Sequence, residues 1–171
     1  MWKYTGKRKP EFAIEPAPGQ ESVWDYPRPP ICRVDEREVL VKFGKEVIAQ
    51  SKRSIRVLET ASPPTFYIPP KDVHTEKLVR SNGSSFCEWK GLASYWALKS
   101  MSATDLSVGW SYENPSAQFV SITNYISFYP SIVECEVNGE RVRPQPGGFY
   151  GGWVTDDIVG PYKGEPGTSD W

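Results

Sequence analysis

The sequence has few of the residues that most often carry metal or redox chemistry, with three Cys and one His among 171 residues. Cys32, Cys87 and Cys135 lie far apart and are odd in number, which argues against a disulfide framework. They form no C-x-x-C pair, whereas a structural zinc site needs four clustered thiol or imidazole ligands. The sequence also lacks G-x-G-x-x-G, P-loop and G-x-S-x-G motifs. We therefore expect no metal and no cofactor.

The sequence also lacks an excess of charge of either sign. Lys and Arg number 20 and Asp and Glu 21, which gives a net charge of -1. Nucleic-acid-binding domains usually carry a basic excess, so we expect no nucleic-acid partner. No apolar run approaches the ~18 residues of a membrane span, so we expect no membrane partner. The start, "MWKYTGKRKPEF", lacks the apolar region of a secretory signal, so we expect a cytoplasmic location.

Aromatic residues, by contrast, are abundant, at 13% with seven Trp. Rings in this number build a thick β core or a pocket for flat or apolar ligands. Residues 1–33 are rich in proline and predict an extended arm, with Trp24 and Tyr26 holding it to the body. Residues 144–171 are rich in Gly and aromatics and should wrap over the core domain, which we place at 34–143.

Short alternating segments in the core predict β-strands. "EVLVKF" and "EVIAQS" flank a "GK" turn and predict a hairpin, and "SIVECEVNGERVR" predicts another with "NG" as its turn. Further strands are expected at "SSFCEWK", "LASYWALKS" and "VGWSYE". In "SIRVLET", alternation places Ile55, Val57 and Glu59 on one face and Arg56 and Leu58 on the other.

One segment has helical character. Asn114 is suited to the N-cap and Pro115 to the first turn, and apolar residues recur at helical spacing as far as Ile126. Pro130 should end the helix. The fold class expected from the residues is mainly β with one main α-helix and two long terminal extensions.

Six segments, in this order, resemble one known family: "ESVWDYPRPP", "RVLETASPPTFYIPPKDV", "FCEWKGLASYW", "WSYENP", "ISFYPS" and "FYGGWVTDDIVGPYKGEPGT". They look like the family catalogued as domain of unknown function 427. The resemblance implies a β-tent-like fold, in which two small antiparallel sheets meet at an angle and ligands sit between them.

The resemblance implies little about activity. The β-tent group includes zinc-bearing methionine sulfoxide reductases and the drug-binding domain of cereblon, but this sequence lacks the two C-x-x-C pairs with which many members hold zinc. The family has sometimes carried a nucleotidyltransferase label. That chemistry needs a Gly-Ser turn followed by spaced carboxylates for Mg²⁺, and "NGSSF" is followed by no such pair.

Cys87 and Lys90 raise the question of a reactive thiol. A lysine near a cysteine can lower the pKa of the thiol. Residues three apart on a strand point to opposite faces, however, and a free Cys in an apolar strand is most often an inert core residue. We therefore assign Cys87 to the core. Lys90 is either a solvated strand end or a group that meets an anionic substrate or Glu59.

Arg56 and Glu59 have two interpretations. They are a pair on the sheet surface, or Glu59 is a proton-transfer group at a loop mouth, since binding groups concentrate in loops. His74, the only histidine, lies in an expected exposed turn and is either an acid or base or an ordinary surface residue.

Two hypotheses follow. The first is a small-molecule-binding protein or enzyme that uses acid/base chemistry, with Glu59 and Lys90 as catalytic residues. Its ligand site would be lined by the residues Arg56, Tyr67, Tyr95, Trp110 and Tyr112. The second is a non-catalytic interaction module whose aromatic arm and tail dock on a protein. A homodimer through an exposed strand edge stays an open alternative under both.

Overall fold

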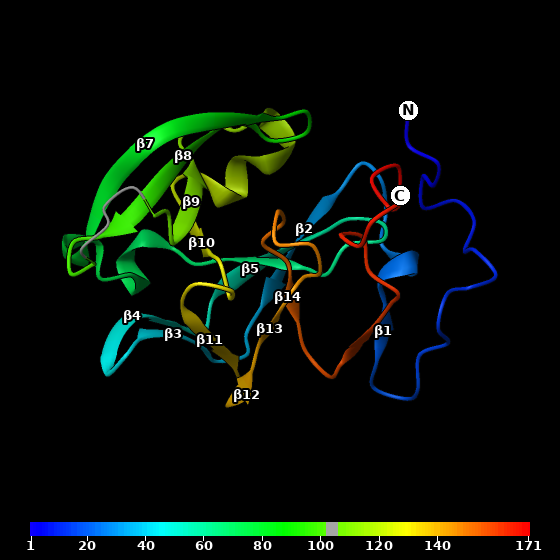
Figure 1. Cartoon of the computed structure of the whole chain (residues 1–171), viewed down its shortest axis with the longest axis horizontal. Coiled ribbons are helices and arrows are strands. Elements are labelled where there is room, and N and C mark those ends of the chain that lie inside the picture. The colour runs from blue at the N-terminus through cyan, green and yellow to red at the C-terminus, as the bar shows by residue number, and fades with distance from the viewer. Residues whose placement is uncertain (102–105) are drawn as a thin grey trace.

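The computed structural model describes residues 1–101 and 106–171, and these form a mainly β protein made of several small sheets (Figure 1). One antiparallel sheet has the order β10-β9-β8-β7, with bounds Ile126–Phe128, Gly109–Tyr112, Gly91–Leu98 and Leu78–Cys87. A second has the order β12-β11-β3-β4, with bounds Glu140–Arg141, Glu134–Val137, Val39–Phe43 and Glu46–Ser51. The third has the order β2-β5-β6, with bounds Ile31–Asp35, Ser54–Leu58 and Thr65–Tyr67.

The remaining elements are short. Two strand pairs join β1 to β15 in parallel and β13 to β14 in antiparallel, with bounds Glu21–Ser22, Ile158–Val159, Arg143–Pro144 and Trp153–Val154. The helices are all of the 3-10 type within the described residues: η1 Val23–Asp25, η2 Pro70–Asp72, η3 Thr75–Lys77 and η4 Ala117–Ile122. No helix in these parts of the chain is long and apolar enough to cross a membrane.

Both predicted hairpins are confirmed. Strands β3 and β4 pair around the "GK" turn, and β11 and β12 pair around "NG". Asn138 and Gly139 have φ values of 47° and 80°. Positive φ at both central residues is what a type I′ hairpin turn requires, and Asn-Gly is its preferred sequence.

The predicted α-helix is wrong in type and in length. The segment after Pro115 forms only η4, and Phe119 inside it leaves helical geometry at φ -114° and ψ 16°. Ile126 instead belongs to β10, where it pairs with Ser111 and also bridges to Ile68. Sheet pairing therefore overrides the helical spacing of the apolar residues.

Strand β5 separates two regions of the interior, as its alternation predicts. Ile55 and Val57 pack into one apolar cluster with Tyr67 and Trp110. Leu58, on the other face, packs into a second cluster with Trp24. The two faces of one strand thus serve different parts of the protein.

The N-terminal arm is built into the fold. Trp24 and Tyr26 are 2% and 5% exposed, which confirms that they hold the arm to the body. The arm contributes β1, which pairs with β15 of the C-terminal extension, and the two lie together at one end of the molecule (Figure 1). Strand β2 begins at Ile31, so the first strand of the core domain lies partly within the predicted arm.

The C-terminal extension also enters the main core. Trp153 is fully buried, stacks on Phe66 with ring centroids 4.8 Å apart, and donates its indole N–H to the Phe128 oxygen at 2.9 Å. Because a buried Trp N–H needs an acceptor, this bond fixes the ring in place. The extension is therefore a structural part of the interior.

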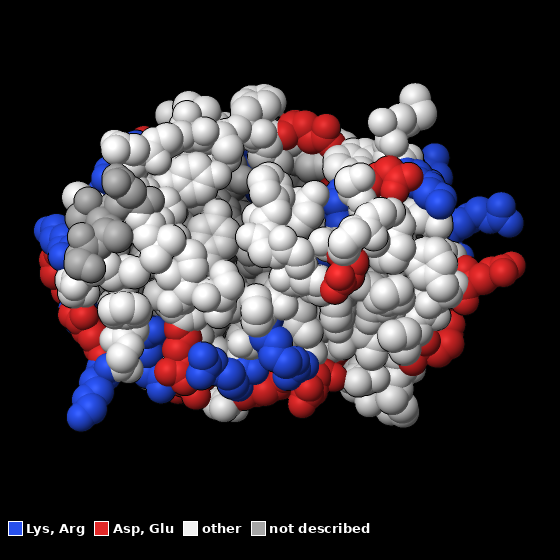
Figure 2. Space-filling model, in the orientation of Figure 1, with Lys and Arg blue, Asp and Glu red and all other residues white. Residues whose placement is uncertain are grey.

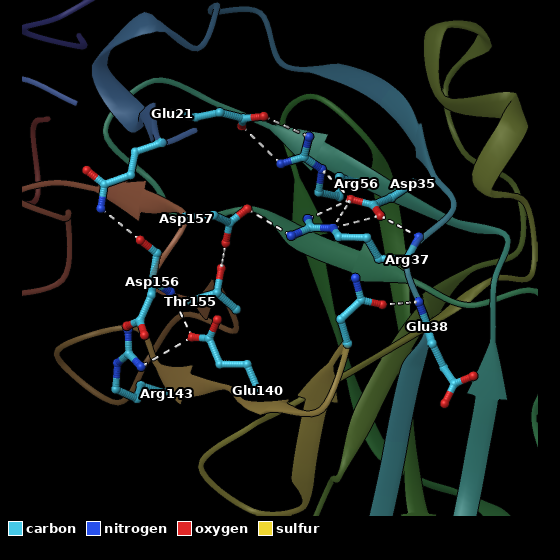
Figure 3. A network of polar contacts seen from close by, with 12 residues as sticks. Glu21, Asp35, Arg37, Glu38, Arg56, Glu140, Arg143, Thr155, Asp156 and Asp157 are labelled. Carbon is cyan, nitrogen blue, oxygen red and sulfur yellow. Dashed lines mark hydrogen bonds and ion pairs between the residues drawn. The ribbon is translucent and has the colours of Figure 1, made fainter. Parts of the chain in front are cut away.

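An ion network joins β5 to the two terminal segments (Figure 3). Arg56 is 6% exposed, and its guanidinium lies 3.0 Å from Glu21 Oε2 and 3.0 Å from Asp35 Oδ2. Arg37 contacts the same Asp35 oxygen at 2.7 Å and Asp157 Oδ2 at 2.8 Å. A buried guanidinium must be paired, so these carboxylates hold the arm, β2 and the extension around Arg56.

Removal of the Arg56 charge tests this network. Arg56→Met leaves Glu21 without its cation and Asp35 paired with Arg37 alone, and we expect the free energy of unfolding to fall by about 3 kcal/mol. Urea denaturation measures the change. Arg53→Met is the matched control because Arg53 pairs with Asp72 through a side chain that is 60% exposed, so we expect little change. Equal losses in both variants would contradict the network's role.

The network also predicts loss of stability in acid. Burial disfavours the charge of Asp35, but the hydrogen bonds and charge of Arg37 and the charge of Arg56 outweigh it and hold its pKa below the ordinary 3.8. Burial likewise opposes ionisation of Glu21, but Arg56 and Tyr26 hold its pKa below 4.5. Carboxylates with lowered folded-state pKa values stabilise above the unfolded pKa, and this contribution disappears as pH falls through the folded pKa.

We therefore expect the free energy of unfolding to decrease from about pH 5 to about pH 3. The decrease should be shallower for Arg56→Met, since Glu21 loses the cation that lowers its pKa, while Arg37 still lowers the pKa of Asp35. Urea titrations at a series of pH values measure both slopes. A variant slope as steep as that of the wild type would show that other groups cause the acid sensitivity.

Candidate functional site

A cavity of about 510 Å³ lies between strands of two sheets and the C-terminal extension. Its lining comes from β5 and β6, from β7, β8 and β9, and from segments around Gly151 and Lys163. This volume falls in the range of pockets that hold small organic molecules. On the face shown in Figure 2, uncharged side chains predominate, and most charged residues gather along the lower edge and at the two ends.

Pairing between β8 and β9 places the aromatic residues of the lining. Tyr95 lies opposite Trp110, and Ala93 lies opposite Tyr112. Residues two apart on a strand share a face, so all four line the same side of the sheet. Tyr67 of β6 closes this group from the other sheet, and its hydroxyl accepts a hydrogen bond from Trp110 Nε1 at 3.1 Å. The four aromatic residues predicted for the site therefore meet in one cavity.

The C-terminal extension approaches this aromatic group closely. Gly151 lies against the Trp110 ring, and a side chain at this position would clash with that ring. Tyr129, which packs on Trp110 with centroids 4.6 Å apart, lies next to the same glycine. Only glycine allows the extension to pack here without moving Trp110.

Glu59 follows β5 and lines the cavity, on the face that alternation predicts. Its Oε1 lies 3.2 Å from Nε of Arg28, whose side chain is 2% exposed. Arg28 also donates to the main-chain oxygens of Tyr4 and Thr60 at 2.6 and 3.0 Å. The N-terminal arm thus supplies the cation that holds Glu59 in position.

Lys90 also lines the cavity, and its ammonium nitrogen lies 5.7 Å from the centre of the Tyr112 ring and 5.9 Å from that of Phe119. No carboxylate of the described residues forms an ion pair with it. Burial works against the charge, but Tyr67, Cys87 and Glu59 together raise the pKa of Lys90. Lys90 is therefore a cation at neutral pH.

The prediction that Cys87 and Lys90 face opposite sides is wrong. Strand β7 ends at Cys87, and residues 88–90 form the turn into β8. Alternation does not continue through a turn, so both side chains reach the cavity. Cys87 is half-buried there, whereas Cys135 is fully buried in the main core.

Two of the residues considered in the sequence analysis, Arg56 and His74, lie outside the cavity. Arg56 does not line the cavity, because it points from the opposite face of β5 into the ion network. Its placement in the ligand site is therefore wrong. His74 precedes η3 at the surface, with its side chain 52% exposed and its Nδ1 3.1 Å from Glu76. Within the residues described, no cluster of three or more His, Cys, Asp or Glu is arranged to hold a metal ion.

Residues near both ends of the chain complete the cavity and were missed in the sequence. Lys163 is 3% exposed, and its ammonium lies 3.8 Å from the centre of the Trp2 ring and donates to the Trp171 oxygen at 3.2 Å. Burial and the charge of Arg28 lower the pKa of Lys163. Trp2 donates its indole N–H to Glu88 at 2.7 Å. No local motif marks these residues, since only the packed termini bring them together.

A family model described as Domain of unknown function (DUF427) matches residues 31–139. The chain belongs to this family. The resemblance seen in the sequence is thereby confirmed. A comparison with curated proteins finds no match. In this DUF427 protein the matched residues include Glu59, Lys90 and the predicted aromatic lining, whereas Trp2, Arg28 and Lys163 lie outside the match.

The position of Trp2 predicts the reactivity of Cys87. Trp2 lines the cavity and is bonded to Glu88, the neighbour of Cys87, so Trp2→Ala should open a path to the thiol. We expect iodoacetamide to alkylate Cys87 several-fold faster in this variant, as followed by mass spectrometry of peptides. Cys135 is the internal control, because burial raises its pKa and removes it from solvent. An equal acceleration at Cys135 would indicate general unfolding instead.

Proposed function

We propose that the cavity binds a small organic molecule with a flat, apolar body, and that Glu59 and Lys90 act on it by acid/base chemistry. The observation that carries this proposal is an aromatic-lined cavity that holds a carboxylate and, separately, a lysine that forms no ion pair with a carboxylate of the described residues. Apolar pockets with a few convergent polar groups are the usual form of small-molecule sites.

The two polar residues suit different roles. Glu59 is a carboxylate with one oxygen held by Arg28, which leaves Oε2 to accept a proton from a bound molecule. Lys90 stays protonated and stabilises negative charge that develops on a substrate oxygen as that proton leaves. Return of the proton to a different atom would complete an isomerisation, and loss of a leaving group would complete a lyase reaction.

The buried phenol of Tyr67 complements this pair. Burial raises its pKa, so the hydroxyl keeps its proton at neutral pH. Its oxygen already accepts a bond from Trp110, which leaves its own proton for an acceptor in the cavity. Tyr67 is thus suited to donate a hydrogen bond to the substrate.

Several wider expectations belong to the same proposal. We propose that the two sheets beside the cavity correspond to the β-tent arrangement that the family resemblance implies. The scarcity of Cys and His supports chemistry without a metal or cofactor. Balanced charge supports a protein that acts on small molecules rather than on nucleic acids, and we propose a cytoplasmic location. A homodimer formed through an exposed strand edge is kept as an alternative to a monomer.

A protein-interaction role is the second candidate. Phe86 and Phe149 line the cavity and are 76% and 80% exposed. Exposed aromatic side chains are enriched where proteins bind one another. In that case a protein partner would cover the mouth of the cavity, and no small molecule would bind inside it.

Glu59→Gln tests the catalytic proposal. A thermal-shift screen of metabolites identifies a ligand, and conversion of that ligand is then followed by NMR. The amide keeps the shape of the carboxylate but accepts no proton, so we expect binding within about tenfold and turnover reduced by about 10²- to 10⁴-fold. Circular dichroism confirms that the variant, which loses the Arg28 ion pair, is folded.

Glu36→Gln is the matched control for the charge change, since Glu36 is exposed and does not line the cavity. We expect wild-type turnover from it. Wild-type turnover from Glu59→Gln would remove Glu59 from the mechanism. Stabilisation by a protein fragment and by no metabolite would favour the interaction role.

A further inference from the structure

The turn between β7 and β8 contributes two side chains with hydrogen-bond donors to the lining of the cavity, those of Lys90 and Trp89. Lys90 forms no ion pair with the described residues, although its ammonium lies beside the rings of Tyr112 and Phe119. The neighbouring Trp89 also lines the cavity, and its indole Nε1 is buried without a hydrogen-bond partner among residues 1–101 and 106–171. A buried donor without an acceptor is costly to a protein, and a cation in an apolar cavity is stabilised when an anion pairs with it.

The carboxylates of the lining do not compensate these donors. Glu59 is paired with Arg28 at 3.2 Å, and Glu88 accepts the indole N–H of Trp2 at 2.7 Å. Neither forms an ion pair with Lys90. A group that enters the cavity with negative charge and free lone pairs would pair with Lys90, and a shift of the Trp89 ring that turns its Nε1 toward the cavity would let the same group satisfy Trp89.

We propose that the molecule bound in the cavity is an organic carboxylate, with its oxygens held by the Lys90 ammonium and the Trp89 indole N–H. Its flat apolar body would lie against Tyr95, Trp110 and Tyr112. This inference rests on the proposed function of the cavity and names the class of its ligand. A single ammonium with a neutral donor matches a group that carries one negative charge and two oxygens.

The lining favours a carboxylate over a phosphate. Phosphate groups are commonly held by arginine forks or by main-chain N–H groups at a helix N-terminus. No arginine is present among the lining residues of the described chain, and the nearest helical segment, η4, is a short 3-10 helix. The other lining lysine, Lys163, lies under Trp2 and is bonded to Trp171.

Matched pairs of probes test the inference on the full chain. Phenylacetate, indole-3-acetate and 2-naphthoate are compared with their neutral amides by thermal shift and isothermal titration calorimetry. We expect at least one carboxylate to bind at least tenfold more tightly than its amide. Phenyl phosphate is included, and tighter binding of it than of every carboxylate would overturn the assignment.

Substitutions show which residues cause the carboxylate to bind more tightly than its amide. Lys90→Met should remove the difference between carboxylate and amide, and Trp89→Phe should weaken the carboxylate several-fold while the amide changes less. Lys99→Met is the control for loss of one positive charge, because Lys99 is exposed at the end of the same hairpin and does not line the cavity. If Lys90→Met does not fold, Trp89→Phe tests the subsite alone.

The outcomes separate this inference from the proposed function. Equal binding of acids and amides would overturn the carboxylate subsite and leave a small-molecule site in place. A preference that survives both Lys90→Met and Trp89→Phe would place the anion elsewhere and also overturn the inference. Binding of no probe, acid or amide, at millimolar concentration would contradict both proposals.

Discussion

Burial of the Arg56 guanidinium is the constraint around which the other segments are arranged. Strand β5 carries this charge into the interior, where a cation without partners would be strongly destabilising. Glu21 comes from the N-terminal arm, and Asp35 from the end of β2. Arg37 extends the network to Asp157 of the C-terminal extension. The two ends of the chain are therefore fixed to the core through charges as well as through apolar contacts.

The opposite face of β5 turns this arrangement into a cavity. Val57 and Glu59 point away from the ion network toward the aromatic residues of the neighbouring sheet. Arg28 of the arm holds Glu59, and Gly151 of the extension lies against Trp110. The family model covers residues 31–139, so part of the site is supplied by segments beyond the family match. Terminal segments in this protein therefore contribute both to its buried ion network and to the shape of its candidate site.

Local patterns succeeded where one segment carries enough information to fix its own conformation. The "NG" hairpin is specified by two residues that tolerate positive φ, and the alternation in β5 assigned Glu59 to the cavity face. Patterns failed where pairing with another strand or a turn changed the outcome. Ile126 has helical spacing but pairs with β9, and the turn after Cys87 ends the alternation on which its assignment to the core depended.

The sequence by itself determined a mainly β chain, its two hairpins, its family and the aromatic residues of the cavity, because alternation, turn residues and composition act locally. Only the tertiary structure decided that Arg56 faces away from the site, that Lys90 pairs with no carboxylate in the described part of the chain, and that Trp2 and Lys163 belong to the lining. The physical reason is that pairing of buried charges and closure of a cavity depend on which segments pack together. Residues separated by most of the chain meet there, and no pattern within either segment encodes the contact.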